Sequence, residues 1–328
     1  MRPCLTPPPR GMALIMVMGA LALIALVAAR YAQRIDDLSR QTGSLRAHAD
    51  QSLQSRSALA AALYYTATRR VGPAGFGPPL TPELRVDNRE YSFPDGGQVR
   101  VQDQRGLMAL NAVDRVGLSS VLKQLGVAPG EAGRLVDVLE DYLDTDNLKR
   151  LNGAEAPEYA AAGLPPPRND FMGSVRELAR MPGWRDAPQV IAALEQWMAP
   201  TRRPVVNPNT APIELLAAWW PWAAPEQLEL LRTLRESTPF QNGIQASRAT
   251  GLPLDRDDIV FHAGAEMRIT VSATGSSRAL QYNVLLTPGG RSAPWLISHM
   301  QAVPRVEPRT TPDRVDAFPL AIAAPRQP

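Results

Sequence analysis

The feature that most constrains this chain is an uncharged apolar run over residues 12–29, which follows a short leader ending in Arg10 and Gly11. At about 1.5 Å of rise per residue, a helix over this run spans about 27 Å. That length is close to the ~30 Å thickness of bilayer hydrocarbon. The pattern stays helical after the run, so we expect a membrane anchor that continues as helix to about Thr68.

A secretory signal peptide is the competing interpretation of the same run. Its apolar core covers about 7–15 residues and ends at a small-residue cleavage site. This run is longer, and Ala28-Ala29 before Arg30 is a poor site. The order of a charge, a glycine and an apolar run is instead typical of a type IV prepilin leader cut between Gly11 and Met12. The basic leader favours the cytoplasmic side of the membrane, which leaves the bulk of the chain on the other side.

Composition argues against several classes of function. The formal net charge of +3 is too small to favour nucleic acid binding by bulk electrostatics. The only cysteine, Cys4, lies in the leader, so the processed chain can use neither a disulfide nor a thiolate. The histidines are His48, in the long N-terminal helix, and His262 and His299, which are typical of surface or core positions. The Asp-rich segments could act as acid and base, but nothing pairs them with a nucleophile or pocket. We therefore expect no enzyme.

The rest of the chain predicts strands on both sides of a helical block. Alternating segments at 89–93 and 98–103 flank a Pro-Asp-Gly-Gly turn, which is a hairpin signal. Strand patterns return at 267–271, 280–286 and 295–300. Apolar residues at helical spacing predict helices between them, at 113–125, 129–143, 174–180, 188–198 and twice within 205–237. Thr210 is the expected N-cap of the first of these last two, with Pro212 in its first turn.

An acidic segment after the helix at 129–143 is the best candidate site. If Asp144 is position 1 of an EF-hand loop, three later residues occupy positions 3, 9 and 12, namely Asp146, Asn152 and Glu155. Leu148 and Lys149 break the match at positions 5 and 6, so an EF-hand proper is not expected.

Two interpretations of the acidic segment remain open. A looser oxygen cage could hold Ca2+, which accepts 6–8 oxygens in irregular geometry, with Asp141 as a further ligand. The alternative is a solvated acidic helix end that binds no metal.

Residues 207–216 resemble the start of a helix-hairpin-helix DNA-binding element. That element needs a Gly-rich hairpin whose backbone amides approach phosphate. The connection at 219–225 has Trp219, Trp220 and Trp222 but no glycine. Since tryptophans more often serve as core or interface anchors, we expect no nucleic acid binding.

Together these segments resemble the K class of minor pseudopilins of type II secretion systems (the GspK family), over nearly the whole chain up to its Pro-rich tail. The motifs are a prepilin-peptidase site, a D-x-x-G motif with a following Asn, a D-W-x-D-x-D motif followed by G-A-E and Tyr, and an N-x-N-T-A-P motif. Arg10-Gly11-Met12 resembles the peptidase site, and Asp103-Gln-Arg-Gly106 with Asn111 resembles the D-x-x-G motif. Asp141-Tyr-Leu-Asp144-Thr-Asp146, followed by Gly153-Ala-Glu155 and Tyr159, resembles the D-W-x-D-x-D motif and the residues after it. Asn207-Pro-Asn-Thr-Ala-Pro212 resembles the N-x-N-T-A-P motif. Tyr142 stands where the family usually has Trp.

The resemblance implies an α+β fold with a long N-terminal transmembrane helix, a small antiparallel pseudopilin sheet and a large inserted α-helical domain. With the patterns above it predicts the following order of parts: a prepilin leader at 1–11, the transmembrane and pilin helix at 12–69, the first part of the β domain at 70–105, the inserted helical domain at 106–255, the C-terminal strands at 256–302, and a Pro-rich tail without packed structure at 303–328.

It also implies a minor pseudopilin at the tip of the type II secretion pseudopilus, which initiates or caps assembly and supports protein export across the outer membrane. The implied partners are the I and J minor pseudopilins, the prepilin peptidase and the inner-membrane secretion platform. The implied location is the inner membrane, with a single pass, the bulk in the periplasm and a methylated Met12.

Two further implications concern the ion and the filament. The family implies structural Ca2+ in the insert, for which the candidate ligands are Asp141, Asp144, Asp146, Asn152 and Glu155.

Met16 stands where most pilin-like subunits have a carboxylate, and the K class resembles this chain in lacking it. The alternative function is a minor pilin of a type IV pilus or DNA-uptake system, which would lack the large helical block.

Overall fold

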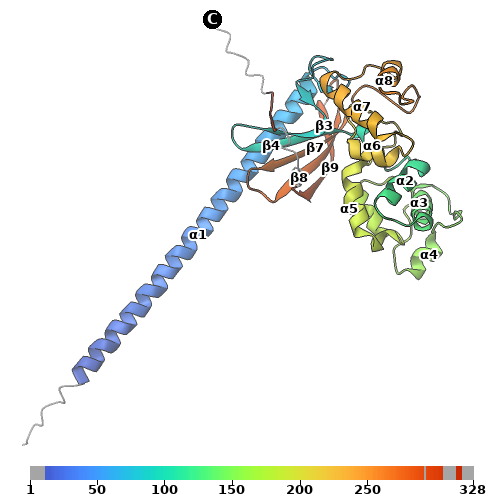
Figure 1. Ribbon diagram of the computed structural model, residues 1–328. Coiled ribbons are helices and arrows are strands. Elements are labelled where there is room, and N and C mark those ends of the chain that lie inside the picture. The colour runs from blue at the N-terminus through green and yellow to red at the C-terminus, as the bar shows by residue number, and fades with distance from the viewer. Residues whose placement is uncertain (1–11, 292, 306–314, 320–328) are drawn as a thin grey trace, which may run out of the picture. The chain divides into compact units, whose positions relative to one another are not determined.

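The computed structural model describes residues 12–291, 293–305 and 315–319, coloured along the chain in Figure 1. The chain forms two compact units, residues 1–53 and residues 54–328. Gly11, and with it the predicted cleavage point, lies outside the described residues.

Helix α1, Met12–Thr68, matches the continuous helix that the sequence predicts. Within the first unit its side chains are exposed throughout residues 14–50, and Met16 is 71% exposed. In the described part of the chain, α1 is the one helix long and apolar enough to cross a membrane. So large an exposed apolar surface is typical of a helix that lies in lipid or against other protein chains.

In the second unit, the C-terminal part of α1 packs on a six-stranded sheet. The fully buried Ala58 and Ala62 belong to one core with the inward-facing strand residues. Gly97 permits this close approach, because a Cβ there would lie 2.9 Å from the Gln54 carbonyl oxygen. Small residues on both sides therefore bring the helix against the sheet.

The strands of this sheet run in the order β10-β3-β4-β7-β8-β9. All neighbours are antiparallel except β10 and β3, which are parallel. The bounds are β3 Asp87–Ser92, β4 Gly97–Asp103, β7 Glu266–Ala273, β8 Arg278–Leu286, β9 Trp295–Pro304 and β10 Asp316–Ala317. The predicted hairpin is confirmed as β3 and β4. Two short pairs lie outside the sheet, β1 Gly75–Phe76 with β2 Leu84–Arg85, and β5 Met108–Ala109 with β6 Met198–Ala199.

The helices after α1 come between β4 and β7, which are neighbours in the sheet (Figure 1). The α-helices are α2 Arg115–Gln124, α3 Pro129–Leu143, α4 Ala156–Ala161, α5 Pro188–Trp197, α6 Ile213–Trp219, α7 Pro225–Ser237 and α8 Gly243–Thr250. Three 3-10 helices accompany them, η1 Gln104–Gly106, η2 Val175–Arg180 and η3 Trp184–Asp186. This order of elements is that of a helical block inserted into an α+β fold.

The helical block has two hydrophobic cores of its own. One surrounds the fully buried Trp184 and joins α2, α3 and α5, and the other joins α6, α7 and α8. The indole of Trp184 donates a 2.9 Å hydrogen bond to the carbonyl of Leu135 in α3. Separate polar contacts join the block to the sheet.

Sequence patterns gave the wrong N-cap for α6 and did not predict α4 or α8. Thr210 is not the N-cap of α6, because Pro212 occupies that position and the Thr210 hydroxyl donates to Asp103. Helix α8 was not predicted, although Asn242 caps it through a 2.9 Å bond from the backbone N–H of Gln245.

The expectation of an unpacked tail from residue 303 was wrong for the parts that the structure describes. Strand β9 continues to Pro304, and Asp316–Ala317 pair with β3. Phe318 is buried, with its ring stacked 4.6 Å from that of Phe93. A single aromatic residue therefore holds a short segment in a Pro-rich sequence against the sheet.

Candidate functional site

The acidic cluster lies where α3 ends and the chain turns through residues 144–155 into α4. Asp144 caps the end of α3 through a 3.1 Å bond from its backbone N–H to the Glu140 carbonyl. Glu155 stands at the N-cap of α4, and Pro157 lies in the first turn. The end of one helix and the start of the next thus position Asp144 and Glu155, two members of the candidate ligand set.

Arg150 is the main cation of this cluster. Its Nη1 atom lies 2.7 Å from Asp141 Oδ1 and 2.5 Å from Asp144 Oδ2, and its Nε atom lies 2.9 Å from Glu140 Oε2. Its backbone N–H also faces the fully buried Asp141 carboxylate, at 3.2 Å from Oδ2. One guanidinium therefore forms ion pairs with three carboxylates at the end of this helix.

Glu155 has no comparable partner. Its side chain is buried, at 4% exposure, and neither carboxylate oxygen accepts a hydrogen bond within the protein. Burial raises the pKa of Glu155, and the negative charges of Asp141, Asp144 and Asp146 raise it further. A buried carboxylate without a donor is costly, so this group stands out as the unsatisfied member of the cluster.

The other two candidate ligands have different surroundings. Asp146 is exposed, and its Oδ1 atom accepts a 2.7 Å bond from the Leu148 N–H. Asn152 faces Asp137, since its backbone N–H and its Nδ2 each lie 3.2 Å from Asp137 Oδ2. The structure brings Asp141 and Asp144 together through Arg150, and it directs Asn152 toward another carboxylate.

Sequence reasoning missed Asn169 as a neighbour of this cluster. Its Nδ2 atom donates a 2.7 Å bond to the Asp146 carbonyl, while its own Oδ1 is buried without a donor. It also adopts a positive φ of 51°, which Asn tolerates better than most residues. An Asn with positive φ beside an acidic loop gives only a weak sequence signal.

The side chains of this cluster are of the chemical type that binds a hard cation, but they are not gathered around one point. In the residues that the structure describes, no three His, Cys, Asp or Glu side chains are arranged so that they could hold a metal ion as they stand. The buried oxygens without a hydrogen-bond donor include Asp144 Oδ1, both carboxylate oxygens of Glu155 and Asn169 Oδ1. Carboxylate and amide oxygens are the ligands that Ca2+ prefers.

Gly153 is required in this loop for steric reasons. A Cβ at this position would lie 1.8 Å from Asp141 Oδ2. The glycine of the G-A-E motif thus allows the backbone to pass directly over the buried carboxylate.

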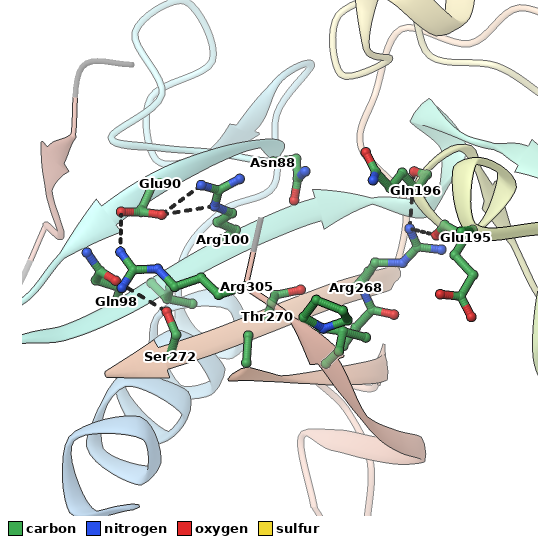
Figure 2. A pocket seen from close by; sticks show the side chains of 16 residues that line it. Asn88, Glu90, Gln98, Arg100, Glu195, Gln196, Arg268, Thr270, Ser272 and Arg305 are labelled. Atoms are coloured by element: carbon green, nitrogen blue, oxygen red, sulfur yellow. Dashed lines mark hydrogen bonds and ion pairs between the residues drawn. The ribbon is translucent and has the colours of Figure 1, made fainter. Parts of the chain in front are cut away.

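A cavity of about 310 Å³ lies between α5 and the sheet (Figure 2). In it Glu90 accepts from Arg100 at 2.8 Å, and Arg305 lies 3.9 Å from the other Glu90 oxygen. Arg268, on β7, reaches across to α5, where its Nη1 donates to the Glu195 carbonyl at 3.0 Å. The cations lining the cavity thus have partners within the protein, which favours a structural role.

Two arginines from the β domain cap helices of the insert. Arg268 donates to the last carbonyls of α5 and to that of Met198, and burial lowers the pKa of its guanidinium to about 10. Arg85, on β2, donates to the Arg235 carbonyl at 2.8 Å, in the last turn of α7. A helix ends with carbonyls that lack partners and with partial negative charge. These contacts therefore fix two helix ends to the β domain.

The D-x-x-G and N-x-N-T-A-P motifs contact each other at a buried joint between the sheet and the insert. The fully buried Asp103 accepts from the Arg105 and Gly264 N–H groups at 3.1 and 3.0 Å, and from the Asn207 amide and Thr210 hydroxyl at 3.2 and 3.1 Å. Burial raises the pKa of Asp103, while these donors lower it. Both motifs therefore have a structural explanation.

The glycine and the second asparagine of these motifs complete the joint. A Cβ on Gly106 would lie 2.7 Å from the Thr210 carbonyl oxygen. The Asn209 side chain bonds both backbone groups of Phe240, at 2.9 Å each.

Comparison with known proteins agrees with this architecture. The family model described as type II secretion system (T2SS), protein K, matches residues 102–201, which contain α2, α3, α5 and the acidic loop. A chain of the GspK-GspI-GspJ complex from the enterotoxigenic Escherichia coli type 2 secretion system has a similar fold, with a TM-score of 0.52 and 15% identity over 83% of this chain and 100% of that chain. No curated protein sequence gives a significant match. Residues 102–201 thus match the domain of type II secretion protein K, and the fold of the chain is similar to that of a chain in the GspK-GspI-GspJ complex.

Proposed function

We propose that this chain occupies the tip of the type II secretion pseudopilus, where it initiates or caps assembly and supports protein export across the outer membrane. The observation that carries the proposal is the protein K domain at 102–201, in a helical block between two neighbouring strands of the sheet. Its role is structural, and no catalytic step is part of it.

The N-terminal helix supports placement at the end of a filament. In pilin-like fibres, a carboxylate at the fifth mature residue pairs with the N-terminal amine of a neighbouring subunit. Met16 occupies that position if the chain is cut before Met12, and it has no charge to offer. An unpaired ammonium is costly to bury in an apolar bundle, so a subunit of this kind is better tolerated at the end than in the shaft.

The proposed partners are the I and J minor pseudopilins. The E. coli chain of similar fold was crystallised in a GspK-GspI-GspJ complex. We also propose processing at Gly11-Met12 by the prepilin peptidase, methylation of Met12, contact with the inner-membrane platform, and a single-pass position with the bulk in the periplasm. The exposed apolar part of α1 is compatible with such an anchor.

Labelling of the assembled fibre tests the tip position. Immunogold label on this chain is expected at one end only, with low copy number, and deletion should impair secretion or change fibre length. Label along the whole fibre would contradict the proposal. Gly11→Lys should leave the leader uncut, as intact mass will reveal. Co-purification with the I and J pseudopilins, compared with retention on DNA, distinguishes this function from that of a minor pilin in DNA uptake.

We further propose that the acidic cluster holds a structural Ca2+ ion. Asp141, Asp144 and Glu155 are the expected ligands, and Asp146 and Asn152 would join them after movement of the loop. Such an ion would be the positively charged partner that the Glu155 carboxylate lacks within the protein. Binding to the folded state alone adds about 2.7 kcal/mol at a hundredfold excess over Kd. Melting of the full chain in detergent, with Ca2+ or with chelator, measures this gain, and identical melting would contradict a structural site.

A further inference from the structure

Arg150 occupies the position that a bound cation would need. Its guanidinium contacts Asp141 and Asp144 at 2.7 and 2.5 Å. Both are expected ligands in the calcium proposal, on which the present inference rests. The same carboxylate oxygens cannot be neutralised by the guanidinium and coordinate a divalent ion at once. An ion that coordinates Asp141 Oδ1 and Asp144 Oδ2, the two oxygens that Arg150 contacts, therefore excludes Arg150 from them.

Arg150 satisfies only part of the cluster. The two oxygens of the buried Glu155 and the Oδ1 atom of Asp144 have no hydrogen-bond donor. A guanidinium carries one charge on a planar group, and here it pairs with Glu140, Asp141 and Asp144. These buried oxygens, which Arg150 does not contact, indicate that the cluster binds a further cation.

Packing restrains Arg150 only weakly. Its side chain is 35% exposed. Its loop carries Leu148 and Leu151, which are 78% and 93% exposed and so contribute little packing. Glu140 would keep a cation after the departure of Arg150, because Arg115 also pairs with it.

We propose that Arg150 is a built-in counter-ion, which neutralises the acidic cluster in the metal-free protein and swings out when a divalent cation binds. The loop at 147–152 is then the part of the insert that changes with the metal. The exchange also lowers affinity: if Arg150 occupies the carboxylates about nine-tenths of the time, apparent binding weakens about tenfold. The counter-ion therefore prevents repulsion in the empty cluster at the expense of affinity.

Calorimetric titration of CaCl2 into the full chain in detergent tests the exchange. Arg150→Gln is expected to bind Ca2+ about tenfold more tightly than the wild type. Lys149→Gln is the matched control, because it removes the same charge from the neighbouring residue, which pairs with Glu158 instead. The control should change affinity by less than about twofold, since Lys149 is exposed and its charge is screened.

The outcomes separate this proposal from the calcium proposal. If Arg150→Gln binds no more tightly than Lys149→Gln, Arg150 is not a competitor and the exchange is wrong, although calcium binding stands. If the wild type and both variants bind no Ca2+, both proposals fail. Glu155→Gln should abolish binding by removing a ligand, and unchanged binding there contradicts the ligand assignment alone.

Chemical modification of the wild type gives a second test that needs no variant. Phenylglyoxal reacts with accessible arginines, and peptide mass spectrometry reports the rate at each residue. Arg150 should react several times faster in Ca2+ than in chelator at equal ionic strength. Arg232, which pairs with Glu229 on the distant helix α7, serves as the internal reference. Equal rates at Arg150 in the two conditions would overturn the proposed release.

Discussion

Asp103 and Glu155 are both carboxylates buried in the second unit, but their surroundings differ. Asp103 is fully buried, and its two oxygens accept hydrogen bonds from two backbone amides and two side chains. Glu155 is 4% exposed, and its oxygens accept none. The pKa of each is raised, with burial as the largest cause. For Asp103 the donors oppose that rise, whereas for Glu155 neighbouring carboxylates add to it.

This difference distinguishes a carboxylate that stabilises the fold from one that is available to bind a cation. A buried polar group in a native protein normally has partners, and Asp103 follows this rule at the joint between sheet and insert. Glu155 departs from it beside other acids. A departure of that kind needs an explanation, and an added cation provides one. Acidic residues of two family motifs, Asp103 and Glu155, can thus be required for different physical reasons, one for the joint and the other for a ligand.

The largest expected effect is that of Asp103→Ala. The change leaves donors of Arg105, Gly264 and Thr210 without their acceptor in a buried place. Each such group costs about 1–3 kcal/mol, so we expect a loss of about 4 kcal/mol. Urea unfolding of the full chain in detergent measures it. Asp257→Ala, at an exposed position, should change little, and a loss below about 1 kcal/mol at Asp103 would show that the joint is not essential.

Much of the fold could be predicted from the sequence, because local patterns determine it. Helix α3 has the predicted bounds 129–143, since apolar residues recur at helical spacing and Pro129 begins the helix. The hairpin of β3 and β4 follows from its turn residues. Strand β10 could not be predicted, because only two residues pair and the burial of Phe318 depends on distant aromatic rings.

The candidate site was less predictable, because it depends on which side chain turns inward. Lys149 and Arg150 are adjacent, and only Arg150 faces the carboxylates. Thr210 has a good capping sequence, yet Asp103, 107 positions away, receives its hydroxyl bond. Long-range contacts of this kind leave no local pattern in a single sequence.

Arg268→Met should have the next largest effect and tests whether the sheet holds α5 through charge. The methionine fills part of the same space but leaves the carbonyls of Glu195 and Met198 without this donor. Hydrogen bonds from a charged group contribute about 1.5–3 kcal/mol, so we expect a loss of about 2.5 kcal/mol. Arg278→Met on the exposed face of β8 is the control. Equal losses in the two variants would contradict the capping role.

Glu155→Gln should change the free energy of unfolding in the opposite direction to Asp103→Ala, which sharpens the comparison of the two carboxylates. In chelator the change removes a buried negative charge from a cluster of acids, so the free energy of unfolding should rise by about 1 kcal/mol, a typical size for a single substitution. The increase on adding Ca2+ should vanish in this variant. Asp50→Asn on the exposed part of α1 controls for the loss of one charge. A destabilised variant in chelator would mean that Glu155 already has a stabilising partner.

The smallest expected effect concerns Asp87, a third carboxylate with little exposure, which has a cation as its partner. Arg89 binds it through Nε at 2.9 Å and through Nη2 at 2.7 Å. Burial raises the pKa of Asp87, but the hydrogen bonds and charge of Arg89 outweigh burial and hold the pKa below its usual value of 3.8. The folded state therefore keeps this carboxylate ionised where the unfolded chain has already bound a proton. Its contribution to stability is present above about pH 4 and is lost as the pH falls through the lowered pKa.

Arg89→Gln should remove that pH dependence. At pH 7 the variant should be less stable by about 1 kcal/mol, because Arg85, whose Nε lies 3.4 Å from Asp87, still provides charge. The difference from the wild type should shrink as the pH falls below 4, since protonation of Asp87 removes the same interaction from the wild type. Urea unfolding at pH 7, 4 and 3 measures it, with Arg248→Gln on the exposed face of α8 as the control. A constant difference at all three pH values would mean that Arg89 acts by packing and that its charge is incidental.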